Sequence, residues 1–396
     1  MKDLDIIVYG ATGFTGKLCA DYIHATGRPI KWAIAGRNAD KLKSVLAGLS
    51  PEVEIVIADC DDDVALQAMA ARAKVVLSTT GPFHRYGSKL VAACVENSTH
   101  YVDITGENFW VKKMIERHHE TAAAKGVRII PSCGFDSIPS DLGSFFGIRK
   151  LGEAIKRVES FHSFKGGASG GTLETIFSMG DLDLKDELTD PFLLNPPDSF
   201  SEEMHAKSRD SFEIAKRPEI NGWGGPFVMA GANTRVVRRS AALLSLRQEP
   251  YGPNFTYREF AFNKSRSQAI RSALGLGAMA LVVMTPLRKL VRPLLKRPGE
   301  GPTQAERDNG WFDCKFIVET ESGEKSVFVM HGEGDPGYKV TSKLVSECAL
   351  CLLENADELP GGAGYGGVLT SASGLGEALI DRLSKVGVHF DGPISV

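Results

Sequence analysis

Short apolar runs alternate with amphipathic stretches along the first third of the chain. Runs rich in β-branched residues that end at a glycine or a polar residue are typical of buried strands, and the stretches between them have helical spacing. The expected strands lie at 6–9, 30–36, 54–58, 74–79, 100–104 and 127–131, and the expected helices at 15–24, 39–49, 63–71, 89–96 and 110–125. Six strands with intervening helices and short crossovers predict an α/β fold, a Rossmann-type doubly wound parallel sheet.

The alternation ends near residue 150, and the second half of the chain has a different pattern. Strand-like runs without regular helices follow at 156–166, 227–244, 255–263, 311–323 and 325–334. Strands joined by short turns, such as 321–324, are expected to pair in antiparallel fashion. The loop 190–223 is rich in Pro, Asn, Ser and Gly, and is either a lid or a plain mobile connection. This half of the chain predicts an α+β domain with a largely antiparallel sheet.

The first apolar run leads into a glycine turn with the spacing Gly10-x-x-Gly13-x-x-Gly16. A strand, a glycine turn and a helix together present unpaired backbone N–H groups to a phosphate, and glycines let the backbone come close to it. The spacing differs from the common G-x-G-x-x-G pattern, so the position after a first strand carries the prediction of a dinucleotide site. The predicted pyrophosphate site comprises Gly10, Thr12, Gly13, Phe14, Thr15 and Gly16.

The residues after the second strand bear on the choice between NAD and NADP. An NAD site usually has Asp or Glu about 20 residues beyond the glycine turn for the ribose 2′-OH, whereas an arginine can pair with a 2′-phosphate. Here the strand ends at Gly36 and is followed by Arg37 and Asn38. The sequence therefore predicts NADP(H), with an ordinary solvated arginine as the alternative.

Three further loops follow the carboxyl ends of predicted strands, where ligands bind in such sheets. Asp59 and Cys60 follow the third strand, and Asp59 either accepts from an adenine amino group or is a capping or solvated carboxylate. The fourth strand leads into TTGPFHRYG at 79–87, which we expect against the ribose and the nicotinamide. Its cofactor candidates are Thr79, Thr80, Gly81 and Pro82. The sixth strand ends in SCGFDSIPSD at 132–141.

Hydride transfer from a nicotinamide needs a donor that stabilises or protonates the charge developing on the substrate. The candidate catalytic residues are Tyr86 and His84 in the fourth loop and Asp136, beside Ser137, in the sixth. Structural roles are open for two of them, because Tyr86 could stack on its loop and Asp136 could be the N-cap of the following helix. The sequence does not separate these candidates.

Composition narrows the class of protein. A hydrophobic content of 43% and a charged content of 24% are typical of globular proteins, and a net charge of −3 gives no reason to expect nucleic acid. Seven scattered cysteines and the absence of a signal peptide predict a reduced, cytoplasmic protein. The C-x-x-C of Cys348 and Cys351 lies in an apolar helical run and fits core packing, and the adjacent His118 and His119 point to different faces. No metal site is expected.

An uncharged stretch follows in the second half. Between Arg271 and Arg288 lie 16 consecutive uncharged residues, which is fewer than a bilayer requires. An amphipathic basic pattern follows, in which apolar Leu287, Leu290, Val291, Leu294 and Leu295 are interspersed with Arg288, Lys289, Arg292, Lys296 and Arg297. Residues 272–297 are expected either to contact a membrane surface with anionic lipid or a partner groove, or to close the domain core.

Several long motifs resemble one known family. DIIVYGATGFTG (5–16), AGRN (35–38), TTGPFHRYG (79–87), THYVDITGE (99–107) and CGFDSIPSDLG (133–143) together resemble the saccharopine dehydrogenase-like oxidoreductases. Within that family the chain resembles the branch of the trans-acting enoyl reductases of mycobacterial lipid synthesis and the animal saccharopine dehydrogenase-like proteins. Residues 299–312, 335–350 and 366–383 also resemble this branch, so the resemblance spans nearly the whole chain.

The resemblance implies a second domain inserted between the nucleotide fold and a C-terminal return to it. The expected organisation is an NADP-binding Rossmann domain at 1–135, a substrate and oligomerisation domain at 136–334, and a C-terminal part at 335–396 whose helices and strand pack back on the first domain. An exposed face of the antiparallel sheet would suit a homodimer.

The branch and the apolar stretch favour an NADPH-dependent enoyl (C=C) reductase that acts on an apolar, lipid-linked substrate. One alternative is a saccharopine-type dehydrogenase acting on a C–N bond of an amino acid. For that substrate, the residues Arg235, Arg238, Arg239 and Arg247 could pair with carboxylates. The other alternative is a protein without turnover that binds NADP at lipid surfaces.

Overall fold

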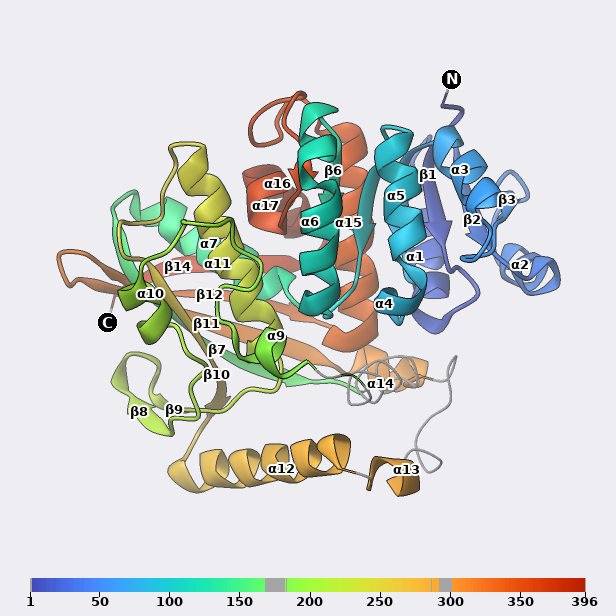
Figure 1. Ribbon diagram of the computed structural model, residues 1–396. Helices are drawn as coiled ribbons and strands as arrows, with labels where there is room; N and C mark the ends of the chain where they lie inside the picture. Colours follow the sequence, from blue (N-terminus) through green and yellow to red (C-terminus); the bar gives the residue numbers. More distant parts are fainter. Residues whose placement is uncertain (1, 168–181, 183, 286, 292–300, 396) are drawn as a thin grey trace.

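Seven parallel strands form the first sheet of the protein, whose computed structural model describes residues 2–167, 182, 184–285, 287–291 and 301–395 (Figure 1). The strands are β1 (Leu4–Tyr9), β2 (Trp32–Gly36), β3 (Glu54–Ile57), β4 (Ala73–Ser78), β5 (His100–Asp103), β6 (Arg128–Ile130) and β13 (Gly367–Val368). Their order is β13-β6-β5-β4-β1-β2-β3. The predicted doubly wound parallel sheet is confirmed, and β13 adds a strand that the pattern of the first 131 residues does not contain.

Helices cover both faces of this sheet, which explains why its strands are apolar on both sides (Figure 1). On β1, Ile6 and Val8 belong to one buried core, and Ile7 and Tyr9 belong to the other. The covering helices are α1 (Phe14–Ala25), α2 (Ala39–Leu46) and α15 (Thr341–Glu354) on the first side, and α3 (Asp63–Arg72), α5 (Ser88–Glu96) and α6 (Asn108–Ala124) on the second. The order of the strands reverses between β1 and β4, which is where a dinucleotide binds in such folds.

A second sheet of seven strands has the order β14-β12-β11-β7-β10-β9-β8. Its strands are β7 (Ile155–Lys165), β8 (Ala215–Arg217), β9 (Gly222–Gly225), β10 (Thr256–Asn263), β11 (Trp311–Thr320), β12 (Lys325–Glu333) and β14 (Val388–Ser395). Every neighbouring pair is antiparallel except β7 and β10, which run parallel. The largely antiparallel second sheet is therefore as predicted.

One strand-like run of the second half is a helix, so that prediction is wrong. The sequence pattern indicates an extended segment at 227–244, but α11 (Ala230–Leu246) occupies most of it. Its middle, from 233 to 244, is buried apart from Ala241 and includes Arg235, Arg238 and Arg239, so it lacks the polar stripe that marks a surface helix in a sequence. Its guanidinium groups donate to backbone carbonyl groups instead of water.

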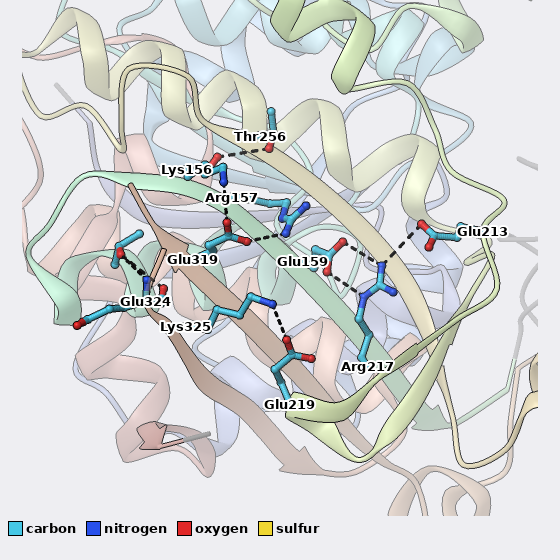
Figure 2. Close-up of polar contacts among 11 residues, drawn as sticks. Lys156, Arg157, Glu159, Glu213, Arg217, Glu219, Thr256, Glu319, Glu324 and Lys325 are labelled. Carbon is cyan, nitrogen blue, oxygen red and sulfur yellow. Dashed lines mark hydrogen bonds and ion pairs between the residues drawn. The ribbon is translucent and has the colours of Figure 1, made fainter. Parts of the chain in front are cut away.

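The two faces of the second sheet differ in what covers them. The helices α7 (Ile138–Leu151) and α11 pack on its inner face, toward the first sheet (Figure 1). Ion pairs cross its outer face and connect neighbouring segments (Figure 2). The pairs are Arg157–Glu319, Lys156–Glu319, Arg217–Glu159 and Lys325–Glu219, at 2.5, 2.9, 3.0 and 2.6 Å. Phe161, Phe260 and Ile317 form a small apolar cluster on the same face.

The connection between β7 and β9 and the end of the chain complete the second sheet. The described part of that connection contains α9 (Lys185–Thr189), α10 (Glu202–Lys207), β8 and the short helix η1 (Pro218–Ile220). After α15, the chain adds β13 to the first sheet, passes through α16 (Ser371–Gly374) and α17 (Gly376–Lys385), and ends in β14. Because β14 pairs with β12, the C-terminal part contributes to both sheets.

One long helix lies at the edge of the molecule and contacts the second sheet at β9 and β10. α12 (Arg266–Met284) runs along the lower edge of the molecule in Figure 1, and α13 (Arg288–Val291) follows it. The predicted amphipathic basic helix continues into Arg292, Leu294, Leu295, Lys296 and Arg297, which lie outside the described residues. In the part of the chain that the structure describes, no helix is both long and apolar enough to cross a bilayer.

Candidate functional site

The glycine turn after β1 adopts a conformation that requires glycine at two positions. Gly10 has a φ of +88°, and a side chain there would collide with the Thr80 hydroxyl. A side chain at Gly16 would collide with the carbonyl oxygen of Gly10, so this glycine lets α1 pack closely on the turn. At Gly13, by contrast, a Cβ would contact only the Gly10 oxygen at 3.3 Å, so this glycine leaves the helix terminus open to a ligand.

The N-terminus of α1 has the features of a phosphate site. Gly13 is its N-cap, and no side chain accepts from the N–H groups of its first turn among the described residues. Thr12 is exposed and Thr15 is half-buried beside these groups. Phe14 has a different role in the structure: its ring lies edge-on to Tyr338 at 5.2 Å and beneath the Arg307 guanidinium at 5.4 Å.

The end of β2 presents an exposed cation. Arg37 is exposed and has no ion-pair partner within the described part of the chain. Asn38 is the N-cap of α2, and its Oδ1 accepts from the Lys41 backbone N–H at 2.9 Å. Of these two predicted cofactor residues, Arg37 is therefore available to a ligand, whereas Asn38 already caps a helix.

Asp59 and Cys60 lie next to Arg37, after β3. Asp59 accepts from the Asp61 backbone N–H at 3.1 Å and from the Cys60 thiol at 3.4 Å. These hydrogen bonds, together with the Arg37 charge, lower the pKa of Asp59, whereas burial and the Asp59 contact raise the pKa of Cys60. Asp59, Cys60 and the exposed Asp61 place potential ligand atoms within 4.8 Å of one another, a common arrangement of exposed acidic groups without an ion.

The loop after β4 contacts the glycine turn directly. The Thr79 backbone N–H donates to the Tyr9 carbonyl at 3.0 Å, and its hydroxyl donates to the Gly10 carbonyl at 3.3 Å. Thr80 Oγ1 is buried and has no hydrogen-bond partner among the described residues. Gly81 and Pro82 then lead into the one-turn helix α4 (Phe83–Tyr86), at the lower edge of the first sheet in Figure 1.

Within α4, His84 forms a dyad with a fully buried glutamate. Glu107 Oε2 lies 2.6 Å from His84 Nδ1 and also accepts from the His84 backbone N–H at 2.9 Å. Glu107 Oε1 accepts from the Phe83 N–H at 2.7 Å. The carboxylate thus fixes the orientation of the imidazole and engages Nδ1, so Nε2 is the ring nitrogen left for a ligand. Tyr86 is half-buried, and its hydroxyl has no hydrogen-bond partner in the described residues.

The loop after β6 is held by Asp103. One carboxylate oxygen of Asp103 accepts from the backbone N–H groups of Thr105 and Ser132 at 2.9 and 3.0 Å, and the other accepts from the Tyr101 hydroxyl at 2.9 Å. Burial raises the pKa of Asp103 to about 7. The Phe135 N–H donates to Thr341 Oγ1 at 3.0 Å, so α15 holds the loop from the other side.

Asp136 follows Phe135 and is unusual among the carboxylates of this region. Its Oδ1 is excluded from water and has no hydrogen-bond partner among the described residues. Burial raises the pKa of Asp136 to about 6. The N-cap interpretation of Asp136 is wrong, because the N-cap residue of α7 is Ser137 and no side chain caps that helix.

A buried polar cluster on the inner face of the second sheet lies beside Asp136. Tyr257 donates to Glu259 Oε2 at 3.0 Å and lies 2.7 Å from Ser160 Oγ, which is in turn 3.0 Å from His162 Nε2. Asn233 of α11 donates to Glu259 Oε1 at 2.6 Å. Burial lowers the pKa of His162 to about 3. Burial also raises the pKa of Glu259 to about 7, with a smaller contribution from the Asp136 charge.

The dyad and this cluster are connected across the two sheets. Asn108, the neighbour of Glu107, donates to the carbonyl groups of Gly231 and Ala232 at 3.3 and 2.9 Å. These two residues precede Asn233 at the N-terminus of α11. A Cβ at Gly106 or Gly231 would meet nothing within 4 Å, so the space beside this link is open.

Aromatic rings line the same inner face near Asp136. Phe135 lies 5.7 Å from Phe164 and 5.3 Å from Phe312 between ring centroids, and Phe227 stacks on His162 at 4.9 Å. A groove of about 410 Å³ on the second sheet, lined by Ser163, Asp313, Lys315 and neighbouring residues, lies on the opposite face. Side chains alternate along strands, so this groove is separated from His162 and Glu259 by the sheet itself.

Known proteins resemble the chain along its full length. Residues 6–130 match the saccharopine dehydrogenase NADP-binding domain. A putative trans-acting enoyl reductase of Mycobacterium tuberculosis is 38% identical over 413 residues, which cover 98% of this chain and 97% of that protein. A trans-acting enoyl reductase of Mycobacterium leprae is 35% identical over 416 residues with the same coverage. The chain belongs to the saccharopine dehydrogenase-like oxidoreductases.

Within this family the chain groups with the trans-acting enoyl reductases, and it is an NADP-dependent oxidoreductase. The fold also resembles that of saccharopine dehydrogenase (L-Glu forming) from Saccharomyces cerevisiae, with a TM-score of 0.53 and 11% identity over 98% of this chain and 99% of that one. An identity this low shows the fold alone.

The geometry fits NADP(H) as the cofactor of this family member. The uncapped terminus of α1 and the open side of Gly13 suit a pyrophosphate, and the unengaged Arg37 suits a 2′-phosphate. The buried, unpartnered Thr80 hydroxyl at the strand end offers one more polar atom. Phe14 and Asn38, in contrast, have structural contacts that explain their presence without a ligand.

The arginines considered for a carboxylate-rich substrate are engaged elsewhere. Arg238 donates to the carbonyl groups of Pro191 and Tyr257, both at 2.9 Å, and Arg239 donates to that of Val368 at 2.6 Å. Arg235 pairs with Asp210 at 2.5 Å, and Arg247 pairs with Glu249 at 2.5 Å. These guanidinium groups hold α11 to its surroundings.

The sequence offers His84 and Asp136 as candidates but does not point to the residues that contact them or lie beside them. Glu107 stands in the motif THYVDITGE, and its place after a strand is the available signal. Tyr257 and Glu259 alternate with outward-facing residues of β10, so the sequence pattern alone does not show that they face the protein interior.

Proposed function

We propose that this enzyme reduces the C=C bond of an enoyl group in an apolar, lipid-linked substrate, with NADPH as the reductant. The observation that carries the proposal is the His84–Glu107 dyad, which the next residue, Asn108, links to α11 on the inner face of the second sheet. On that face the phenylalanine rings near Asp136 form an aromatic wall. The printed names of the relatives, which describe trans-acting enoyl reductases, support the same reaction. In this proposal, residues 1–135 hold the cofactor and residues 136–334 hold the substrate.

The apolar substrate class rests on the side chains near Asp136. Phe135, Phe164, Phe227 and Phe312 contact one another through their rings, and Phe164 is 40% exposed. Such a wall favours an acyl or isoprenoid chain over a charged amino acid, because apolar contact area binds hydrocarbon without specific pairing. A saccharopine-type substrate would need unengaged cations here, and the arginines of α11 are bound to carbonyl and carboxylate groups.

The chemistry requires a hydride and a proton. Bound NADPH supplies the hydride to the β-carbon of the enoyl group. His84 Nε2 holds the proton that reaches the substrate, and the Glu107 carboxylate, 2.6 Å from Nδ1, keeps the ring in the orientation for transfer. In this proposal Tyr86, on α4 with His84, and Asp136, on the loop after β6, orient the carbonyl group of the substrate.

The test is an assay of NADPH oxidation by the purified protein with trans-2-enoyl thioesters of short and long chain. We expect turnover with the enoyl thioesters and a higher kcat/KM for the longer chain. The comparison substrate is a mixture of L-glutamate and an aliphatic aldehyde, which forms an imine of the kind that an L-Glu-forming saccharopine dehydrogenase reduces. Oxidation of NADPH with that mixture, and not with either thioester, would replace the enoyl proposal with C–N chemistry.

A binding measurement separates loss of chemistry from loss of cofactor. Calorimetric titration with NADPH should give a Kd in the micromolar range or tighter, as is usual for a preformed nucleotide site. Tight NADPH binding without oxidation by any enoyl or imine substrate would favour the protein without turnover that binds NADP at lipid surfaces.

A further inference from the structure

The helix α12 is attached to the molecule only near its beginning among the described residues. The Ser265 hydroxyl accepts from the Gln268 N–H at 3.2 Å and caps the helix, and the Ser272 hydroxyl donates to Asn263 at 3.1 Å. Ala269 is buried against β9, where a Cβ at Gly225 would lie 3.6 Å from its methyl group. From this base the helix runs along the edge of the molecule, below both sheets in Figure 1.

The face of α12 that points away from the molecule is apolar. Ile270, Leu274 and Leu281 are 41%, 69% and 59% exposed. Positions separated by four and eleven residues lie on one side of a helix, so these three side chains form a continuous stripe. Ala273 and Leu276, on the side toward the sheet, are partly covered. Both sides of α12 are therefore apolar after Arg271. A helix that is apolar all round is normally buried, whereas α12 exposes Ile270, Leu274 and Leu281.

The charges around this stripe are all of one sign. From Lys264 to Gly299 the sequence contains no Asp or Glu. Lys264, Arg266 and Arg271 are exposed and have no carboxylate partner in the described part of the chain. The apolar stripe is therefore flanked by unneutralised cations at its N-terminal end, and Arg288 follows at its other end.

This combination points to one type of surface. A lipid bilayer with anionic headgroups offers an apolar layer for Ile270, Leu274 and Leu281 and negative charge for the basic flanks. A second copy of the chain meeting the same face in a symmetric dimer would bring the cations of both helices together without carboxylates from either segment. Charge complementarity thus favours the membrane over self-association.

We propose that α12 docks the enzyme on an anionic membrane surface, with its axis in the plane of the interface. Residues 270, 274 and 281 insert among the acyl chains, and the neighbouring basic residues contact headgroups. No described helix is long and apolar enough to cross the bilayer, so the contact is a peripheral one. This inference goes beyond the proposed reaction and does not depend on its substrate.

The test is vesicle flotation of the full-length protein. The two vesicle types are pure phosphatidylcholine and phosphatidylcholine mixed with phosphatidylglycerol. We expect the protein to float with the mixed vesicles at low salt and to float much less with the neutral ones. The variant Leu274→Ser/Leu281→Ser should bind the mixed vesicles at least about tenfold more weakly, because both side chains leave the apolar layer. The variant Arg266→Gln/Arg271→Gln should weaken binding about fivefold per residue.

The matched control is Leu246→Ser at the end of α11. Leu246 is 69% exposed, as Leu274 is, but it lies outside α12. It should leave flotation unchanged. Equal flotation of the control and the Leu274→Ser/Leu281→Ser variant, or no flotation of the unchanged protein with mixed vesicles, would overturn the proposal.

Two further measurements distinguish membrane docking from self-association and from a folding defect. Sedimentation equilibrium should show the same mass for the unchanged protein and the leucine variant, whereas a dimer that dissociates in the variant would assign the face to a second copy and overturn the membrane proposal. NADPH titration of the variant should give the unchanged Kd, which shows that the fold is intact. Failure of the enoyl assay with successful flotation would refute the reaction and leave the membrane proposal standing.

Discussion

The helices α11 and α12 are consecutive in the second half of the chain and have opposite relations between sequence and environment. α11 carries Arg235, Arg238 and Arg239 in its buried middle part. α12 is uncharged from residue 272 to its end and exposes Leu274 and Leu281. The comparison shows that the type of residue alone does not determine whether a side chain is buried. The arginines of α11 are buried because carbonyl groups accept their hydrogen bonds, whereas Leu274 and Leu281 of α12 are exposed because no part of the protein covers them.

The two helices also differ in their relation to the His84–Glu107 dyad. The N-terminus of α11 lies beside the dyad, whereas α12 does not. We expect His84→Gln to lower kcat by about 10²–10⁴-fold, since it removes the group that holds the proton. The Kd for NADPH should stay unchanged. Steady-state kinetics and calorimetry of the same preparation measure both quantities, and Leu274→Ser with a soluble enoyl thioester is the control that should retain full turnover. A His84→Gln protein with unchanged kcat would mean that the proton comes from another residue.

The buried arginines of α11 should matter for stability far more than the exposed ones of α12. We expect Arg238→Met to lower the free energy of unfolding by about 3–5 kcal/mol, because the carbonyl groups of Pro191 and Tyr257 lose their donor in a buried environment. Arg266→Met should change it by less than about 0.5 kcal/mol. Urea unfolding followed by circular dichroism measures both. Similar values for the two variants would contradict the structural role of the α11 arginines.

The carboxylate that α11 contacts through Asn233 predicts a pH dependence. Burial raises the pKa of Glu259 from 4.5 to about 7, so the folded state holds a proton that the unfolded state releases. The stability from this group is fully present below pH 4.5 and is lost as the pH rises to about 7, by about 3 kcal/mol. Glu259→Gln should remove this loss in urea titrations at a series of pH values.

His162 provides a control of opposite sign for that measurement. Burial lowers its pKa from 6.5 to about 3, so the stability it contributes is present above pH 6.5 and is lost as the pH falls. His162→Gln should therefore flatten the acid side of the curve and leave the loss from Glu259 in place. Parallel curves for Glu259→Gln and the unchanged protein would show that Glu259 is not protonated in the folded state.

Arg37 after β2 and Arg271 of α12 are both exposed and have no ion-pair partner among the described residues. Only Arg37 should contribute to the affinity for the nucleotide. We expect Arg37→Ala to weaken NADPH binding about tenfold, worth about 1.4 kcal/mol, and to leave NADH binding unchanged, because only NADPH carries the 2′-phosphate. Arg271→Ala should change neither Kd. An equal loss of affinity for both nucleotides in Arg37→Ala would remove its role in cofactor choice.

The sequence predicts the first sheet well because its signals are local. The run Ile6 to Tyr9, the turn at Gly10 and the start of α1 follow one another in a few residues, and each obeys a rule of short range. The same locality identifies the loops that hold His84 and Asp136. Their positions after strands follow from the alternation alone.

The missed features depend on contacts between distant segments. Glu107 becomes part of the site only because β5 and β4 are neighbours, and Glu259 only because β10 lies beside β7 and beneath α11. The segment of α11 has the sequence pattern of a strand because its arginines look solvated until the carbonyl groups around them are known. No pattern within a single segment carries this information.

The short strand β13 has a consequence for the order in which the protein can be made. Gly367 and Val368 pair with Arg128 and Ile129 at the edge of the first sheet, and α15 covers one of its faces. The ribosome synthesises the chain from its N-terminus. The sheet that carries the glycine turn can therefore be completed only after β13, more than half of the chain later, has been synthesised. A gene fragment that ends at residue 135 would therefore encode an unfinished nucleotide domain.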